Sequence, residues 1–168
     1  MDAKFKTANG QMLDIRELIR EIFSYMKELP ENFYKISVGT DSELSGATKH
    51  ANLVTAVVVH RVGRGARYFW RNMDDGPFHT LRDRIIREVL ISIDAARDIL
   101  SALQAEEKNF SEGESPKWSF EVHADIGREG DTKAMFQEVV GMILGNNFVP
   151  QTKPMSYAAS SAADRHTS

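Results

Sequence analysis

Four acidic residues, each from a different predicted element, are the part of this chain best suited to chemistry. Asp41 and Asp125 stand at the ends of predicted strands, and Glu88 and Asp164 lie on predicted helices. Carboxylates that are brought together on one side of a sheet repel one another, and burying them is costly unless a cation neutralises their charge. The order strand, helix, strand, helix therefore predicts a divalent metal site assembled from distant parts of the chain.

The amino-acid composition restricts the type of metal. The chain has no cysteine, so a disulfide framework and a thiolate site are both excluded, and any metal must be held by oxygen or imidazole ligands. Carboxylate ligands favour Mg²⁺ or Mn²⁺ as the cofactor.

The chain length and the first apolar pattern predict a single domain with a helical start. A chain of 168 residues with 42% hydrophobic content is long enough for one well-buried core, so residues 1–168 are expected to form one domain. Within residues 1–30, apolar side chains recur with the period of a helix, which ends at Leu29-Pro30. This N-terminal helical extension carries its apolar face on Ile15, Leu18, Ile19, Ile22, Phe23 and Met26.

Three predicted strands follow and position Asp41. Apolar and small or polar residues alternate over 34–43, residues 52–62 are almost continuously β-branched, and residues 66–73 carry three consecutive aromatic side chains. Gly63 and Gly65 supply a turn between the second and third strands. The three strands are predicted to form an antiparallel meander with Asp41 near the end of the first.

The second half of the chain alternates helices with strands. Thr80 followed by Asp83 resembles a capped helix start, and the helix is predicted to run to about residue 105. A polar loop, a strand over 118–126, a helix over 132–144, a short strand over 148–153 and a helix over 156–163 complete the prediction. The result is an α/β fold with a mixed five-stranded sheet, in the order strand, strand, strand, helix, strand, helix, strand, helix, behind the extra N-terminal helix.

Local sequence phrases narrow this prediction to a family. The order of elements resembles the ribonuclease H-like fold, and three phrases look like the bacterial YkuK-like family of that class. They are Val38-Gly39-Thr40-Asp41-Ser42-Glu43, His123-Ala124-Asp125-Ile126-Gly127, and the C-terminal run from Lys153-Pro154-Met155 through Ala163-Asp164-Arg165-His166-Thr167. The resemblance covers the chain from about residue 33 onward.

The resemblance implies a metal-dependent nuclease. By similarity, Asp41, Glu88, Asp125 and Asp164 match the metal-binding and catalytic carboxylates of ribonuclease H-like nucleases. In that chemistry two Mg²⁺ ions about 4 Å apart flank the scissile phosphate, one activating water and the other stabilising the leaving oxygen. Asp41 is the candidate for the bridging ligand. The expected reaction is hydrolysis of phosphodiester bonds in RNA, an RNA/DNA hybrid or branched DNA.

Glu88 has two interpretations from spacing alone. It continues a helical stripe that should face the sheet, because Leu81, Ile85, Glu88 and Ser92 follow i, i+4, i+7 and i+11. The alternative is an ion pair with Arg84, one turn earlier, on the solvent side. The resemblance favours the metal role. For Asp164, spacing alone indicates a solvated acid near the end of the sequence, and only the C-terminal phrase assigns it to the site.

Two histidines are candidates for supporting roles. His123 shares a strand face with Asp125, so it either orients a ligand, binds the metal itself and favours manganese, or forms a hydrogen bond within the sheet. His166 either shuttles protons as part of the catalytic set or has no role.

Candidate substrate contacts come from several segments. Thr40, Ser42 and Lys133 are candidate phosphate contacts, Lys133 because a predicted helix starts beside it. Arg67 and Arg71 flank Tyr68-Phe69-Trp70, a pairing of aromatic rings and positive charge suited to nucleic acid. In a strand, however, Phe69 should face one side and its two aromatic neighbours the other, so part of this motif is expected in the core.

The charge distribution leaves the partner open. The chain carries −3 overall, but its segment from residue 61 to 87 has seven arginines against three acids, a net +4, leaving −7 elsewhere. Such a segment suits nucleic acid, RNA or an RNA/DNA hybrid, and equally forms a solvated surface. The rival function is a weakly active or inactive ribonuclease H-like module that binds nucleic acid or protein. No apolar run is long enough to span a membrane, so a cytoplasmic protein is expected. Its expected oligomeric state is a monomer or a homodimer.

Overall fold

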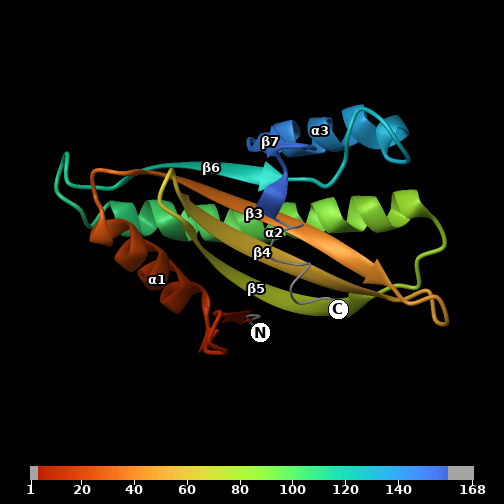
Figure 1. The fold of residues 1–168 in the computed structure, drawn as a ribbon, viewed down its shortest axis with the longest axis horizontal. Coiled ribbons are helices and arrows are strands. Elements are labelled where there is room, and N and C mark those ends of the chain that lie inside the picture. The colour runs from red at the N-terminus through yellow and green to blue at the C-terminus, as the bar shows by residue number, and fades with distance from the viewer. Residues whose placement is uncertain (1–3, 159–168) are drawn as a thin grey trace.

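The central part of the fold is an antiparallel meander of three long strands. The computed structural model describes residues 4–158, and in it β3 (Phe33–Leu44), β4 (Ala51–Arg61) and β5 (Ala66–Asp75) pair in sequence, as Figure 1 shows. The pairing confirms the meander predicted from the alternating and β-branched segments. The turn between β4 and β5 contains Gly63 and Gly65, both with a positive φ that glycine adopts readily.

The remaining strands extend this meander on both sides. β6 (Lys117–His123) pairs in parallel with β3, and β7 (Val149–Gln151) pairs in parallel with β6. On the other edge β1 (Phe5–Lys6) and β2 (Met12–Leu13) form a short hairpin, joined to β5 through Lys6 and Trp70. The order across the sheet is β2-β1-β5-β4-β3-β6-β7.

The prediction of five strands is therefore wrong, because the described residues form a seven-stranded sheet. The two additional strands lie within residues 1–30, which the sequence predicted to be only a helical extension. Each is two residues long, too short to show an alternation of apolar and polar side chains. β1 pairs with β5 and β2 pairs with β1, so the start of the chain is part of the sheet.

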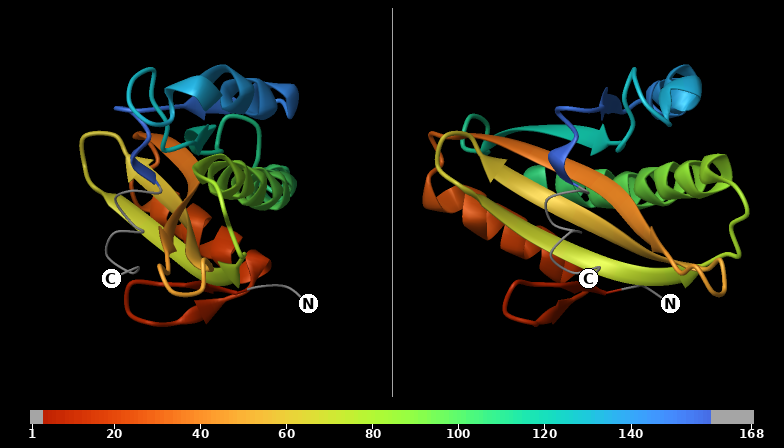
Figure 2. Two further views of the ribbon diagram at one scale, coloured as in Figure 1. Left: turned by 90° about the vertical axis from the view of Figure 1, so that its right-hand side faces the viewer. Right: turned by 45° about the vertical axis from the view of Figure 1, so that its right-hand side comes forward.

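Two helices cover one face of the sheet. α1 (Ile15–Glu28) begins with a capping box between Asp14 and Glu17. α2 (Leu81–Glu107) is capped by Thr80, whose side chain accepts a hydrogen bond from the Asp83 N–H, as predicted. Both pack on the same side of the sheet, as Figure 2 shows. The main core lies between them and the sheet.

The third helix is shorter than predicted and lies beside the edge strand β7. The predicted helix over 132–144 begins as a 3₁₀ turn, η1 (Lys133–Met135), and continues as α3 (Phe136–Gly145). Its buried side chains, Val139 and Ile143, join the main core. The loop between β6 and η1 carries Asp125 and lies at this end of the sheet.

Arg61 shows that part of the arginine-rich segment is structural. Its guanidinium is buried, donates hydrogen bonds to the Tyr25 carbonyl (2.8 Å) and the Tyr34 hydroxyl (3.1 Å), and lies 4.0 Å from the centre of the Tyr25 ring. It also pairs with Glu28 at 3.2 Å. Arg61 therefore fastens α1 to the sheet, and its charge does not contribute to a substrate surface.

Candidate functional site

Asp41 and Asp125 lie at the same end of two neighbouring strands. In the parallel pair β3–β6 the last registered residues are Gly39 and His123, and each aspartate follows its strand's registered residue by two positions. Neighbouring strands are roughly 4.8 Å apart. The two carboxylates therefore leave the sheet side by side, as their positions in the sequence predicted.

Glu88 faces this same end of the sheet from α2. Its side chain is buried, with 4% of its surface exposed, and it accepts a hydrogen bond from the Ser42 hydroxyl. Arg84 donates to the same Ser42 oxygen at 2.9 Å. The sheet-facing interpretation of the helical stripe is confirmed, and the solvent-side ion pair with Arg84 is wrong, because the buried carboxylate binds Ser42.

The electrostatic environment of Glu88 shows that the three carboxylates affect one another. The pKa of Glu88 is raised to about 8. Burial is the largest cause and the charges of Asp41 and Asp125 add to it, whereas the hydrogen bond from Ser42 and the charge of Arg84 lower the pKa. At neutral pH the Glu88 carboxyl therefore holds a proton unless another positive charge approaches. A buried carboxyl whose pKa is raised by burial and by two other acids is a candidate functional group.

A chain of buried hydroxyls lies beneath Glu88 and includes Thr40. Ser92 donates to the Thr40 hydroxyl at 2.7 Å, and Thr40 and Thr55 are joined by a hydrogen bond of 3.0 Å. Thr40 is only 2% exposed. The prediction that Thr40 contacts phosphate is therefore wrong, because its hydroxyl is used inside the protein. Ser42, the other predicted contact on β3, instead connects Arg84 to Glu88.

Removing the Ser42 hydroxyl is expected to shift the pH dependence of any activity that requires ionised Glu88. Ser42→Ala deletes a hydrogen bond that lowers the pKa of Glu88, so the pH at half-maximal activity should rise by about one unit. Activity at pH 7 should fall roughly tenfold, whereas activity at pH 9 should approach that of the wild type. The measurement is a pH–rate profile for both proteins at a metal concentration well below saturation, where the pKa of Glu88 in the metal-free protein governs the profile. An unchanged midpoint would contradict this role for Ser42.

Asp125 has a cationic neighbour that sequence reasoning missed. The Lys153 ammonium lies 3.5 Å from the Asp125 carboxylate. Backbone hydrogen bonds from Ala124 to Gln151 and from Lys153 to Ile126 hold the two segments together. Lys153 stands in one of the phrases that carry the family resemblance, and this was the only signal in the sequence. Its position became apparent only from the pairing of β6 with β7.

His123 is buried and contacts the C-terminal segment. Its Nδ1 accepts a hydrogen bond from the Ala158 N–H at 3.1 Å, and its ring packs edge-on against Tyr157 at 4.8 Å. Burial lowers the pKa of His123 to about 4, so the ring is neutral at physiological pH. The Nδ1 contact fits the alternative of a hydrogen-bonded internal histidine, with its partner on the C-terminal segment and not within the sheet. The buried Nε2 has no hydrogen-bond partner among the described residues, so the two ligand-related alternatives stay untested.

The predicted arginine contacts pack against N-terminal elements, and the predicted lysine contact is exposed. Arg67 stacks on Tyr25 at 4.9 Å and pairs with Glu21, and Arg71 lies 4.7 Å from the centre of the Phe5 ring. Both arginines therefore pack against the N-terminal elements, which argues against their predicted role as substrate contacts. Lys133 is exposed at the start of η1, and its predicted role stays untested.

The aromatic motif on β5 divides between the two faces of the sheet, as predicted. Phe69 is 1% exposed and belongs to the main core under the helices, whereas Trp70 belongs to a separate cluster with Val54 and Tyr68. The Tyr68 and Trp70 rings lie 5.6 Å apart. Because strand alternation places Arg67 and Arg71 on the face of Phe69, the motif does not combine positive charge with the two paired rings.

The donor set fits a hard divalent cation by chemical type. Asp41, Glu88 and Asp125 supply carboxylate oxygens, which Mg²⁺ and Mn²⁺ prefer. Within residues 4–158, however, no three histidine or acidic side chains are grouped closely enough to hold an ion together. Asp164 and His166, the other predicted members of the catalytic set, lie outside the described residues.

Comparisons with known proteins show the family of the chain. The ribonuclease H-like family model matches residues 17–168. The chain is 31% identical over 167 residues to YkuK of Bacillus subtilis (strain 168), itself an uncharacterised protein, with 97% of this chain and 96% of YkuK covered. No solved structure matches significantly. In the part of the chain that the structure describes, no helix is long and apolar enough to cross a membrane.

Proposed function

Because the chain belongs to the YkuK-like family of ribonuclease H-like proteins, we propose that it is a metal-dependent nuclease. The proposed substrates are RNA, an RNA/DNA hybrid or branched DNA, and the proposed reaction is hydrolysis of a phosphodiester bond. The observation that carries this proposal is the placement of three acids at one end of the sheet, with Asp41 and Asp125 just beyond the β3–β6 pairing and the buried Glu88 facing that end from α2. The raised pKa of Glu88 supports it, since burial and the charges of Asp41 and Asp125 all raise that pKa. Placing acids where they repel one another adds no stability, so their placement indicates a functional requirement.

Asp41, Glu88 and Asp125 are the described residues that would hold Mg²⁺ or Mn²⁺, with Asp164 as a fourth ligand. When bound, such ions supply activation of the attacking water and stabilisation of the leaving oxygen. The chain's own contribution is to hold the carboxylates in place. Ser42 and Arg84 orient Glu88 by hydrogen bonding, and the segment around Lys153 fixes the loop that carries Asp125.

Lys153 is proposed as a phosphate contact at the site, in place of Arg67 and Arg71. Lys153→Ala should weaken binding of single-stranded RNA several-fold and reduce the slope of log affinity against log salt by about one, because one phosphate contact is lost. Lys117→Ala is the matched control, since it removes an exposed lysine at the start of β6, the opposite end of that strand from Asp125, and it should change affinity less than twofold. The measurement is fluorescence anisotropy in EDTA at several salt concentrations.

Equal weakening by both lysine variants would contradict a specific role for Lys153. It would indicate instead that positive charge acts diffusely over the surface of the molecule. A loss of affinity without a change in salt slope would likewise contradict a direct phosphate contact.

The test of the proposed function is cleavage of an end-labelled panel by the wild-type protein. The panel contains single-stranded RNA, an RNA/DNA hybrid, single-stranded DNA and a four-way junction, each with Mg²⁺, with Mn²⁺ and with EDTA. Cleavage that requires a divalent ion would support the nuclease and identify its substrate class. Absence of cleavage from the whole panel by correctly folded protein would refute it.

A binding module with little or no activity is the second candidate, and one observation favours it. The raised pKa keeps Glu88 protonated at neutral pH, and Lys153 already neutralises part of the charge on Asp125. The site can therefore exist without a bound ion. Tight binding of nucleic acid in EDTA, combined with no cleavage in Mg²⁺ or Mn²⁺, would support this function over the nuclease.

A further inference from the structure

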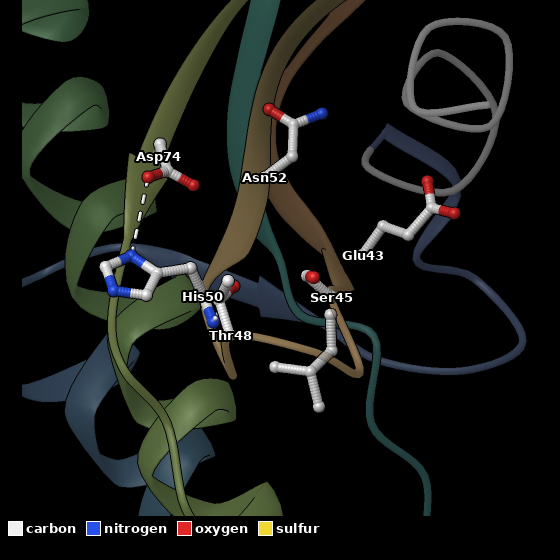
Figure 3. A pocket seen from close by; sticks show the side chains of 7 residues that line it. Glu43, Ser45, Thr48, His50, Asn52 and Asp74 are labelled. Atoms are coloured by element: carbon white, nitrogen blue, oxygen red, sulfur yellow. Dashed lines mark hydrogen bonds and ion pairs between the residues drawn. The ribbon is translucent and has the colours of Figure 1, made fainter.

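A polar groove lies at the far end of the central strands, beyond the candidate carboxylates. It has a volume of about 580 Å³ and is formed by the end of β3, the turn that connects it to β4, and the end of β5. Figure 3 shows the side chains that line it. The polar ones are Glu43, Ser45, Thr48, His50, Asn52 and Asp74.

The groove continues directly from Asp41. Glu43 pairs in register with Asn52, and Asn52 with Asp74, so the three side chains form a row across three strands. Asp41 precedes Glu43 by two positions and shares its side of β3, which places them roughly 7 Å apart along the strand. A strand of nucleic acid that is cut at Asp41 would therefore pass the mouth of the groove.

The chemistry of the lining excludes phosphate as the occupant. Glu43 and Asp74 bring two carboxylates, and the only ionisable partner among the lining residues is His50, whose Nδ1 lies 3.4 Å from Asp74. Asn52 already accepts a hydrogen bond from Asn72 at 3.3 Å. An acceptor-rich groove of this kind repels anions and attracts neutral groups that carry N–H donors.

Nucleobases with an exocyclic amine are such groups. Carboxylates accept hydrogen bonds from the cytosine amine, and proteins that recognise single-stranded RNA read the exposed edges of unstacked bases in this way. Adenine and guanine also carry an exocyclic amine, whereas uracil carries none. The groove therefore matches the bases that present an amine and not the backbone that connects them.

We propose that the Glu43–Asn52–Asp74 groove binds an unstacked, amine-bearing nucleobase of the strand whose backbone lies at Asp41. The proposal rests on the proposed function, because it takes nucleic acid as the substrate. It adds a sequence preference that the cluster of acids does not provide. Glu43 is the residue that discriminates between bases, since its carboxylate is exposed at the open side of the row.

The test measures binding of labelled homopolymeric RNAs of about twelve nucleotides, oligo-C, oligo-A and oligo-U, in EDTA so that cleavage plays no part. Wild-type protein is expected to bind oligo-C and oligo-A about five- to tenfold more tightly than oligo-U. Glu43→Gln keeps the shape and removes the charge, and it should reduce this preference to less than twofold. Asn52→Ala should reduce it as well. Glu31→Gln, an exposed acid near the opposite end of β3, should leave the preference unchanged.

A purely electrostatic role for Glu43 would give a different result. Removing its negative charge would then tighten binding of all three oligonucleotides equally, with the ratio between them unchanged, and this outcome would overturn the proposal. The cleavage panel separates the two proposals. Metal-dependent cleavage without a base preference would refute the groove and leave the nuclease, whereas a Glu43-dependent base preference without cleavage would refute the nuclease and leave the groove.

Discussion

Asp41→Asn is expected to reduce metal-dependent cleavage by about a thousandfold or more. The substitution keeps the size of the side chain and removes the negative charge, and the carboxylate at the end of a central strand is the proposed ligand on which the others converge. The measurement is the initial rate on the best substrate of the panel with saturating Mg²⁺ or Mn²⁺. Asp94→Asn is the matched control, because Asp94 is exposed on α2 and forms an ion pair with Arg97 one turn later. It should retain at least half of the wild-type rate.

The same variant should not lose stability. The charge of Asp41 raises the pKa of Glu88. Urea denaturation in EDTA should therefore give an unchanged free energy of unfolding at pH 7, where Glu88 is protonated, and a higher one at pH 9, where the substitution relieves repulsion between two ionised acids. An inactive variant with a lower stability than Asp94→Asn would mean that Asp41 is structural. An active variant would show that Asp41 takes no part in catalysis.

Glu88→Gln is expected to separate stability from activity. In the metal-free protein the pKa of Glu88 rises from its usual 4.5 in the unfolded chain to about 8 in the folded one. A raised folded-state pKa means that this residue's contribution to stability is fully present below about pH 4.5 and is lost as the pH rises toward 8. Glutamine cannot ionise, so the variant should avoid this loss. Between pH 4.5 and pH 8, the free energy of unfolding of the variant should therefore rise by roughly 4 kcal/mol relative to that of the wild type.

The measurement is urea denaturation in EDTA at pH 4.5 and pH 8, accompanied by cleavage assays. Cleavage should fall at least a hundredfold even though the metal-free protein becomes more stable at pH 8. Glu112→Gln, at an exposed position in the loop after α2, serves as the control and should follow the wild-type pH dependence. The same pH dependence in Glu88→Gln and the wild type would show that Glu88 does not titrate as the structure indicates.

The residues that sequence reasoning placed well depend on local regularities. Alternation along 34–43 identified β3 and placed Asp41 at its end, and the Thr80 and Asp83 pair identified the start of α2. The helical period allowed a sheet-facing Glu88 as one of two interpretations, the family resemblance favoured it, and its 4% exposure agrees. Each inference uses contacts between residues a few positions apart, whose geometry is set by the backbone period of one element.

Only the tertiary structure decided what surrounds these residues. The hairpin of two-residue strands at the start of the chain joins the sheet because β1 pairs with β5. Lys153 reaches Asp125 because β7 pairs with β6. Arg67 and Arg71 pack against residues of α1 and β1, and the Thr40 hydroxyl accepts a hydrogen bond from Ser92 inside the protein. These tertiary contacts explain why the three side chains are not arranged as the predicted substrate contacts. The sequence by itself determined which acids stand at the ends of which elements, because side-chain periodicity is local. The partners, burial and pKa of those acids depend on strand order and register, which join residues far apart in the chain.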